Sequence, residues 1–357
     1  MKYETKKIKE KAFLIGVIYS NKEDVSSQLE ELSRLAHTSG VDVVGSDYQL
    51  IREVTPATLL GSGKVEELKL KIDELGANLV IVDSELTGSQ AKNLSDIFEV
   101  RVIDRITLIL DIFAMRAMTN EGKLQVELAQ LKYNLPRLSS IEGTSGRFGS
   151  AGVGMRGPGE AKLELDKRVV KEKIVKLQNE ISKIKMKRQL NKQERAKSGK
   201  YRVCLVGYTN AGKSTMLNAL AKENIYADDK LFATLDTTSR KIWLSQEVQI
   251  ILTDTVGFIN KLPHSLVDAF SSTLEETKEA DLLLHIIDIS NPQYKEQKKV
   301  VEDVFSNLKV NAPIINVYNK CDKVQDIERE ENAVYMSAKQ KTGIEELKNK
   351  IISVFTN

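Results

Sequence analysis

The chain has 357 residues, a nearly balanced charge of 53 basic and 50 acidic side chains, and only two cysteines. This length suits two or three domains with cores of their own, and the balance means that any affinity for nucleic acid must come from local clusters of charge. The cysteine count excludes a disulfide-stapled secreted protein, and without a signal-peptide segment or an apolar run near the ~20 residues of a membrane span we expect a cytoplasmic chain.

The first hundred residues alternate apolar, strand-like runs with amphipathic helical patterns. Strands are predicted at 13–19, 41–49, 79–82 and 100–103, and helices at 24–37, 65–75 and 89–98. Strands that alternate with helices indicate a parallel α/β domain, which we place at residues 1–105.

A short glycine-containing segment, Gly61-Ser62-Gly63-Lys64, lies between two of these elements. It has neither the spacing of a phosphate-binding loop nor a clear strand before it. A turn that starts a helix is the favoured interpretation, and a phosphate-binding role is the alternative.

The next segment, residues 106–199, is predicted to be a helical hairpin. A helical pattern runs from Ile106 to about Leu135, where Pro136 is expected to stop it. A glycine-rich loop follows at 139–159, and then apolar residues recur every three or four positions, which is typical of a helix that packs on a partner. These are Val170, Ile174, Leu177, Ile181 and Ile184.

Basic residues concentrate in this hairpin. Arg147 and Arg156 lie in the glycine-rich loop, and Lys187 and Arg188 belong to a basic stretch of the second helix. A solvated linker helix is one interpretation of that stretch. A flexible Gly/Arg loop beside it favours RNA binding through phosphate contacts, because lysine and arginine release counterions from nucleic acid.

The last segment, residues 200–357, carries the spacing of a P-loop. Gly207 is followed by four residues and then by Gly212-Lys213-Ser214, directly after an apolar strand-like run. Such glycines let backbone N–H groups face phosphates at a helix N-terminus. Lys213 adds a charge for the outer phosphates, and the Ser214 hydroxyl is a hard oxygen of the kind that Mg²⁺ prefers.

Three further motifs follow in the order found in GTPases, each after an apolar strand: Asp254-Thr255-Val256-Gly257, Asn319-Lys320-Cys321-Asp322 and Ser337-Ala338-Lys339. Asp254 is expected to hold a magnesium-bound water and Gly257 to meet the γ-phosphate. The Asp322 carboxylate can accept from the ring N–H and the amine of guanine, which adenine does not offer, while Asn319 and Lys320 brace the pocket. The predicted fold is a doubly wound α/β P-loop GTPase domain.

The residues expected to contact GTP or GDP are Gly207, Tyr208, Thr209, Asn210, Ala211, Gly212, Lys213, Ser214, Thr215, Asp254, Gly257, Asn319, Lys320, Asp322, Ser337, Ala338 and Lys339.

Several segments outside these motifs resemble the HflX family of ribosome-associated GTPases, within the Obg–HflX group. The resemblance rests on residues 102–105, 109–114, 121–131 and 156–160, and on switch-like segments at 231–236 and 254–259. It implies that Thr234 is a magnesium ligand beside Ser214 and Asp254, and that Lys213, Thr234 and Gly257 carry the catalytic step. It also implies a protein that binds the large (50S) ribosomal subunit and its rRNA, and hydrolyses GTP there.

Position 258 departs from Ras-like enzymes, which use a glutamine after the second-switch glycine to orient the attacking water. Phe258 cannot make those hydrogen bonds, so slow intrinsic hydrolysis and stimulation by the ribosome are expected. A hydrophobic anchor for the switch is the favoured role of this ring. Asn210 stands where potassium-activated relatives place an asparagine, which makes K⁺ a further candidate ligand.

The predicted function is therefore a GTPase that dissociates or rescues stalled or idle ribosomes. The alternative is an RNA-binding assembly or hibernation factor in which GTP is mainly a structural or regulatory ligand.

Overall fold

The structure is a computed structural model that describes residues 9–20, 24–142, 158–196, 201–221, 232, 238–260, 277–326 and 328–356. The chain divides into two compact units. The first comprises Met1–Met115 with Val126–Asn179, and the second Arg116–Gln125 with Glu180–Asn357. Among the helices of the described ranges, none is long and apolar enough to span a membrane.

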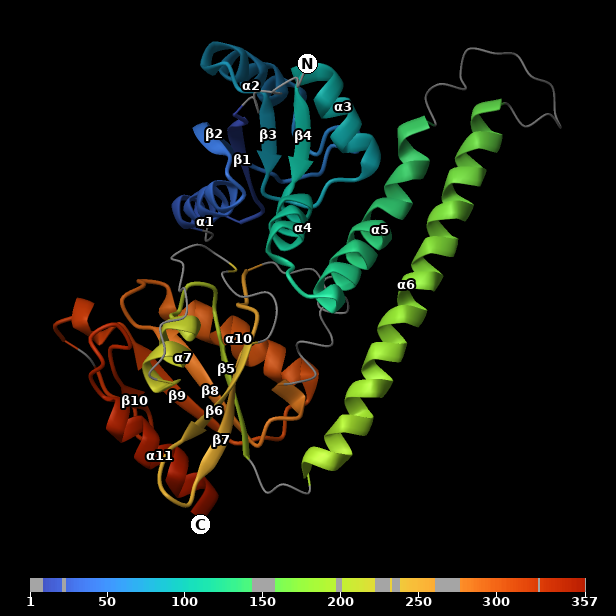
Figure 1. Cartoon of the computed structure of the whole chain (residues 1–357). Helices are drawn as coiled ribbons and strands as arrows, with labels where there is room; N and C mark the ends of the chain where they lie inside the picture. The colour runs from blue at the N-terminus through green and yellow to red at the C-terminus, as the bar shows by residue number, and fades with distance from the viewer. Residues whose placement is uncertain are drawn as a thin grey trace, which may run out of the picture. The chain divides into compact units, whose positions relative to one another are not determined.

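The first unit contains a parallel sheet of four strands in the order β2-β1-β3-β4 (Figure 1). The strands are β1 (Lys11–Ile18), β2 (Asp42–Leu50), β3 (Leu79–Val82) and β4 (Arg101–Asp104), and the helices between them are α1 (Val25–Thr38), α2 (Ser62–Leu75) and α3 (Gly88–Phe98). Strands β1 and β3 are buried along almost their whole length, as expected when helices cover both faces of a parallel sheet. The predicted parallel α/β fold is confirmed.

The segment Gly61–Lys64 forms a turn and the start of α2, with Gly61 at the N-cap position. The Lys64 ammonium pairs with Asp47 at 2.8 Å and with Glu67 at 3.1 Å. Partial burial raises the pKa of the Asp47 carboxyl, but the hydrogen bonds from Lys64, Lys71 and the Tyr48 N–H together outweigh it and hold this pKa down to about 2. Because Lys64 is committed to carboxylates, the structure favours the helix-start interpretation.

Asp104, at the end of β4, is a buried carboxylate that connects two helices to the sheet. Its carboxylate accepts from the Leu86 N–H at 3.1 Å, from the Thr107 N–H at 2.9 Å as a cap of α4 (Arg105–Arg116), and from the Tyr133 hydroxyl. It also pairs with the Arg137 guanidinium at 2.9 Å. Burial and the charge of Asp104 raise the pKa of the Tyr133 phenol, so this hydroxyl stays a donor.

The second helix of this region, α5 (Asn120–Glu142), passes through Pro136, so the predicted stop at this proline is wrong. Proline removes one amide donor from a helix. Tyr133 and Arg137 both engage Asp104, and the Arg137 side chain donates to the Tyr133 carbonyl at 3.2 Å. These contacts hold the helical turns on either side of the proline.

Helix α6 (Pro158–Ala196) follows α5 and forms the predicted hairpin with it (Figure 1). The apolar seam is confirmed, since Ile174, Leu177 and Ile181 are buried, and Lys173 pairs with Glu127 of α5 at 2.6 Å. The two helices extend into the predicted loop from both sides, to Glu142 and from Pro158. Residues 143–157, with Arg147 and Arg156, lie outside the described residues.

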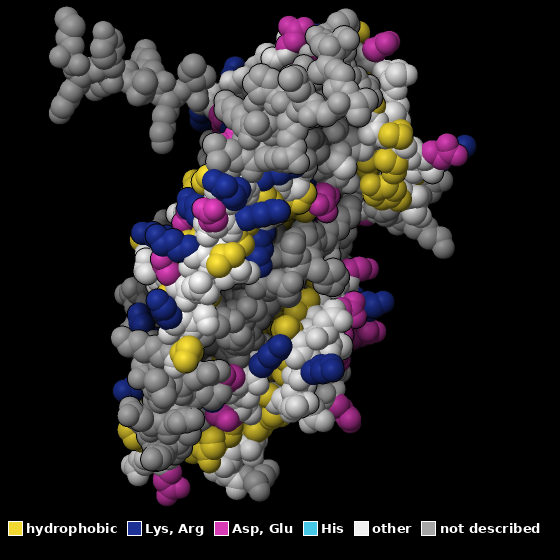
Figure 2. Space-filling view, turned by 90° about the vertical axis from the view of Figure 1, so that its right-hand side faces the viewer, with side chains coloured by type: hydrophobic (Ala, Val, Ile, Leu, Met, Phe, Trp, Pro, Cys, Tyr) yellow, Lys and Arg dark blue, Asp and Glu magenta, His cyan; other side chains and the backbone are white. Residues whose placement is uncertain are grey.

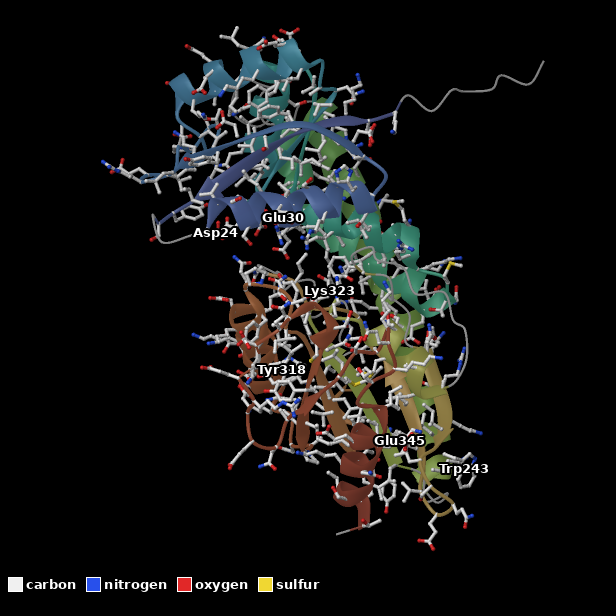
Figure 3. The ribbon with its side chains drawn as sticks, turned by 90° about the vertical axis from the view of Figure 1, so that its left-hand side faces the viewer. Asp24, Glu30, Trp243, Tyr318, Lys323 and Glu345 are labelled. Atoms are coloured by element: carbon white, nitrogen blue, oxygen red, sulfur yellow. The ribbon has the colours of Figure 1, made fainter. Side chains whose placement is uncertain are left out.

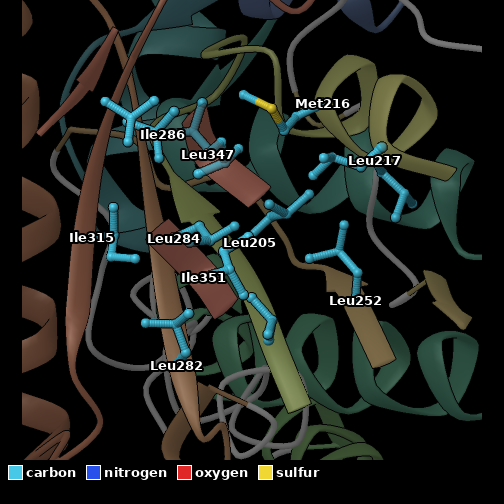
Figure 4. Close-up of a cluster of buried hydrophobic side chains, with 14 of the residues drawn as sticks. Leu205, Met216, Leu217, Leu252, Leu282, Leu284, Ile286, Ile315, Leu347 and Ile351 are labelled. Carbon is cyan, nitrogen blue, oxygen red and sulfur yellow. The ribbon is translucent and has the colours of Figure 1, made fainter. Parts of the chain in front are cut away.

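The second unit contains a six-stranded sheet in the order β10-β9-β8-β5-β7-β6, in which only β6 is antiparallel to its neighbour. The strands are β5 (Tyr201–Gly207), β6 (Thr238–Trp243), β7 (Gln249–Asp254), β8 (Leu282–Asp288), β9 (Ile314–Asn319) and β10 (Val334–Tyr335), and the helices are α7 (Lys213–Ala221), α10 (Tyr294–Leu308) and α11 (Ile344–Thr356). Figure 4 shows one core, where Leu205, Leu252 and Leu284 of the strands meet α7 and α11.

The opposite face of this sheet carries a buried histidine. His285 on β8 is 1% exposed, and its ring meets the Phe305 ring of α10 edge-on at 5.6 Å. Burial, with smaller effects from the charges of Lys298 and Lys213, lowers the pKa of His285 to about 3. The imidazole is therefore neutral in the folded protein at physiological pH.

Replacing Asp104 by asparagine should lower the free energy of unfolding by about 3–5 kcal/mol, because Arg137 would lose its buried counter-charge. Urea unfolding followed by far-UV circular dichroism measures this change. The matched control is Asp111→Asn, since Asp111 is a partly buried carboxylate whose pKa is raised by burial and which pairs with Arg101 at the longer distance of 3.8 Å. Equal stabilities of the two variants would contradict the role given to Asp104.

The His285 pKa makes a second prediction. Between the unfolded pKa near 6.5 and the folded pKa of about 3, the unfolded chain binds the extra proton, so stability is lost as the pH falls below 6.5. The slope from this group approaches about 1.4 kcal/mol per pH unit. His285→Gln should flatten the dependence in urea titrations at pH 7 and pH 5, whereas His37→Gln, at an exposed position, should not. An unaltered slope in His285→Gln would refute this account.

Candidate functional site

The P-loop connects the end of β5 to the start of α7, as the sequence predicts. Two glycines are required there by their backbone and by crowding. Gly207 has φ +153°, and a Cβ on it would lie 2.3 Å from the Ile286 carbonyl oxygen; Gly212 has φ +96°, and its Cβ would lie 2.3 Å from the Asn319 side-chain nitrogen. Any side chain at either position would push β8 or Asn319 away from the loop.

Lys213, the first residue of α7, is buried beneath this loop. Its ammonium donates to the carbonyl oxygens of Gly207 at 3.2 Å and Tyr208 at 2.9 Å. Burial lowers the pKa of Lys213 to about 8, and the nearby Asp254 carboxylate opposes the shift. An anion at the start of α7, where helical N–H groups lack partners, would stabilise the charged form.

The two described candidates for magnesium ligands are in direct contact. The Ser214 hydroxyl donates to the Asp254 carboxylate at 2.7 Å, and Asp254, at the end of β7, is 1% exposed. A hydroxyl and a carboxylate together offer the hard oxygens that Mg²⁺ takes. The third candidate, Thr234, lies outside the described residues.

The segment after Asp254 returns to the P-loop and pairs with it. The Phe258 N–H donates to the Gly207 carbonyl at 3.1 Å, and the Thr209 N–H donates to the Phe258 carbonyl at 2.7 Å. Tyr208 adds its hydroxyl, which accepts from the Asn260 N–H at 2.8 Å. Thr209 was expected to contact nucleotide, but its N–H is committed to Phe258 and is not available for such a contact.

The Phe258 ring points into the protein interior. It is 3% exposed, belongs to the core that includes Val206 and Leu283, and meets the Phe305 ring edge-on at 6.5 Å. The interpretation of Phe258 as a hydrophobic anchor is confirmed.

The expected guanine-binding residues lie at the ends of β9 and β10. The Asn319 side chain donates to the Ala211 carbonyl at 2.9 Å and accepts from the Ala338 N–H at 3.0 Å, so it joins the P-loop to the last motif. The Lys320 ammonium donates to the Asn210 carbonyl at 2.8 Å. Asp322 lies in the 3₁₀ turn Cys321–Lys323 with its side chain exposed, as a base-binding carboxylate requires.

The other members of the predicted set are placed as follows. Ser337 is buried, and its hydroxyl accepts from the Gln340 N–H at 3.1 Å. Lys339 follows it on the exposed side of the same loop, Asn210 adopts φ +61° within the P-loop, and Thr215 lies in the first turn of α7. Lys187 and Arg188 lie on α6, but their side chains are outside the described set.

Sequence reasoning missed several side chains that pair with or pack against the residues of the base-binding motifs. Asp288, at the end of β8, pairs with Lys320 at 2.7 Å. The Tyr318 ring stacks on the Tyr335 ring at 4.8 Å, and the Lys298 ammonium donates to the Tyr318 hydroxyl at 3.2 Å and to Glu330 at 2.9 Å. Tyr318 and Lys323, labelled in Figure 3, mark this end of the unit. A carboxylate at the end of a buried strand was the available signal for Asp288.

Three family models match the chain consecutively. They are described as GTP-binding GTPase N-terminal over residues 26–114, GTP-binding GTPase Middle Region over 116–195, and 50S ribosome-binding GTPase over 202–320. Among solved structures, a crystal structure of SsGBP with GDP aligns with 97% of this chain and 98% of its own, at a TM-score of 0.53 and 25% identity. A GTP-binding protein from Sulfolobus solfataricus in complex with GDP aligns with a TM-score of 0.50 and 25% identity over 97% of this chain and 99% of its own.

Curated relatives are similar over nearly the whole chain. A GTPase HflX of Caldanaerobacter subterraneus is 50% identical over 341 residues, which cover 95% of this chain and 79% of the relative. The GTPase HflX of Escherichia coli (strain K12) is 40% identical over 351 residues, covering 95% of this chain and 81% of the relative. With these similarities and the P-loop, Asp254 and Asn319 motifs gathered at one end of one sheet, the chain belongs to the HflX family of GTPases.

Proposed function

We propose that this GTPase binds the large ribosomal subunit, hydrolyses GTP faster when bound there, and dissociates or rescues stalled or idle ribosomes. The model described as 50S ribosome-binding GTPase and the relatives named GTPase HflX support this proposal. The observation that carries it is Phe258, whose ring is held in the core at the position where a Ras-like enzyme places its water-orienting glutamine.

Nucleotide binding assigns a role to each part of the site. Lys213 pairs with the outer phosphates of GTP, the Gly257 N–H meets the γ-phosphate, and Asp322 accepts from guanine while Asn319 and Lys320 hold the pocket. The contact between the Ser214 hydroxyl and the Asp254 carboxylate supports Mg²⁺ binding there, with Thr234 as a further ligand. Mg²⁺ neutralises phosphate charge as it develops in the reaction.

Potassium is a second proposed cofactor. Asn210 lies in the P-loop at φ +61°, and its carbonyl is fixed by Lys320 at 2.8 Å. This bond holds the backbone of Asn210 in place, which would leave its side chain to help bind a monovalent cation beside the phosphates.

RNA contact is assigned to the hairpin. Exposed lysines and arginines outnumber acidic residues on the described part of α6, including Arg168, Lys171 and Lys176. Figure 2 shows lysine and arginine side chains gathered on one face with fewer acidic ones among them. Arg147, Arg156, Lys187 and Arg188 are the further basic residues that would bind phosphates of ribosomal RNA.

The mechanism follows from the switch contacts. With GTP bound, Thr234 and Gly257 hold the two switch segments against the phosphates, in a state that binds the ribosome. Hydrolysis removes the γ-phosphate, releases the switches and resets binding. Because the protein supplies no side chain at position 258 to orient water, the bound ribosome must order the water or stabilise the developing charge.

GTP turnover by the purified chain, alone and with 50S subunits, tests the proposal. We expect the subunits to raise the rate by about a hundredfold, the effect of one added transition-state donor. Lys213→Ala should lack activity in both conditions, and excess ATP should not compete. A rate that 50S subunits never raise would overturn the proposal and favour an RNA-binding factor with GTP as a structural ligand.

A further inference from the structure

One P-loop side chain carries a buried hydroxyl that makes no hydrogen bond within the described residues. Thr209 is 6% exposed, and within the described residues its hydroxyl oxygen has no hydrogen-bond partner. Its backbone N–H is paired with the Phe258 carbonyl at 2.7 Å, so the position of the residue is fixed from the other side. Buried hydroxyls in proteins are nearly always hydrogen-bonded, and one left without a partner destabilises the fold.

The neighbours of Thr209 are the groups that recognise the terminal phosphate. A Cβ built on Gly257 would lie 2.9 Å from both the Cα and the Cγ2 of Thr209 and 3.0 Å from the Lys213 ammonium nitrogen. Gly257 is therefore packed against Thr209 and Lys213 together. Of these three residues, Lys213 supplies a cation for the outer phosphates and Gly257 an N–H for the γ-phosphate.

We propose that the Thr209 hydroxyl donates a hydrogen bond to a γ-phosphate oxygen of bound GTP. This assignment rests on the proposed binding of GTP at the P-loop and adds to it a group that distinguishes GTP from GDP. A hydroxyl bonded to an anionic oxygen in a water-poor site makes a strong, charge-assisted bond. The γ-phosphate would thus supply the partner that the hydroxyl lacks among the described residues.

The Thr209 methyl group has a separate role, which the test must keep apart from that of the hydroxyl. Because the methyl carbon packs against Gly257, a larger change at position 209 would displace the second switch. Valine keeps a methyl at this place and replaces the hydroxyl by a second methyl of similar size. Serine keeps the hydroxyl and loses the methyl.

The experiment compares Thr209→Val and Thr209→Ser with the full-length wild type, using fluorescent GDP, a non-hydrolysable GTP analogue and single-turnover hydrolysis without ribosomes. In Thr209→Val we expect the analogue to bind about tenfold more weakly, the loss of one charge-assisted bond, and hydrolysis to slow by a similar factor. GDP affinity should stay within about twofold. Thr209→Ser should recover most of the preference for the triphosphate.

The unfolding temperature of the nucleotide-free protein separates the two roles. If the Thr209 hydroxyl stabilised the fold, its removal would lower this temperature. Thr209→Val should unfold at the same or a higher temperature, because it removes an unpartnered buried hydroxyl. The control is Thr253→Val on β7, whose hydroxyl is 2.9 Å from that of Ser239; it should unfold at a lower temperature with an unchanged ratio of analogue to GDP affinity.

Two results would overturn the assignment. Wild-type analogue affinity and turnover in Thr209→Val would show that the hydroxyl does not contact the γ-phosphate, and equal losses of GDP and analogue affinity would show a general distortion of the loop. Both comparisons use the isolated protein. A failure of 50S subunits to stimulate the wild type would therefore refute the proposed function without deciding the role of Thr209.

Discussion

The pairing of Phe258 with the P-loop is the constraint on which the rest of the site depends. Two backbone hydrogen bonds join Phe258 to Gly207 and Thr209, and the Phe258 ring is buried against Phe305. Backbone bonds fix the register of the segment, and ring burial adds roughly 1.5–3 kcal/mol of hydrophobic stabilisation. Gly257 is consequently held against Lys213, and the Phe258 side chain points into the core and away from the nucleotide site.

This arrangement separates binding from hydrolysis. The residues that we propose to bind phosphate, magnesium and guanine are positioned by strand ends and by bonds such as that between Asn319 and Ala211. Lys213 is buried with a pKa of about 8, and a bound phosphate would add a further negative charge to that of the nearby Asp254 carboxylate. Phe258 cannot orient the attacking water for hydrolysis. We therefore assign part of the catalytic step to the ribosome.

Much of this could be predicted from sequence, because spacing and strand context determine where the motifs lie. Asp254 and Asn319 end buried parallel strands, and such ends meet at one edge of a sheet. The helix stop at Pro136 was wrong because contacts of Tyr133 and Arg137 with Asp104, from a distant strand, outweigh the local effect of proline. Partners of this kind, separated widely in sequence, have no local signal. The ion pair between Lys298 and Glu330, near the guanine motif, likewise has no local sequence signal.

The central claim is that the Phe258 ring stays buried in the core whether GDP or GTP is bound. Hydrogen exchange of the Thr209 and Phe258 amides, measured with GDP and with a non-hydrolysable GTP analogue, tests it most directly. Similar, slow exchange of both amides in the two states is the predicted result, since the two bonds that protect them persist. Much faster exchange at Phe258 with the analogue would show that the ring leaves the core, and would contradict the claim that position 258 takes no part in catalysis.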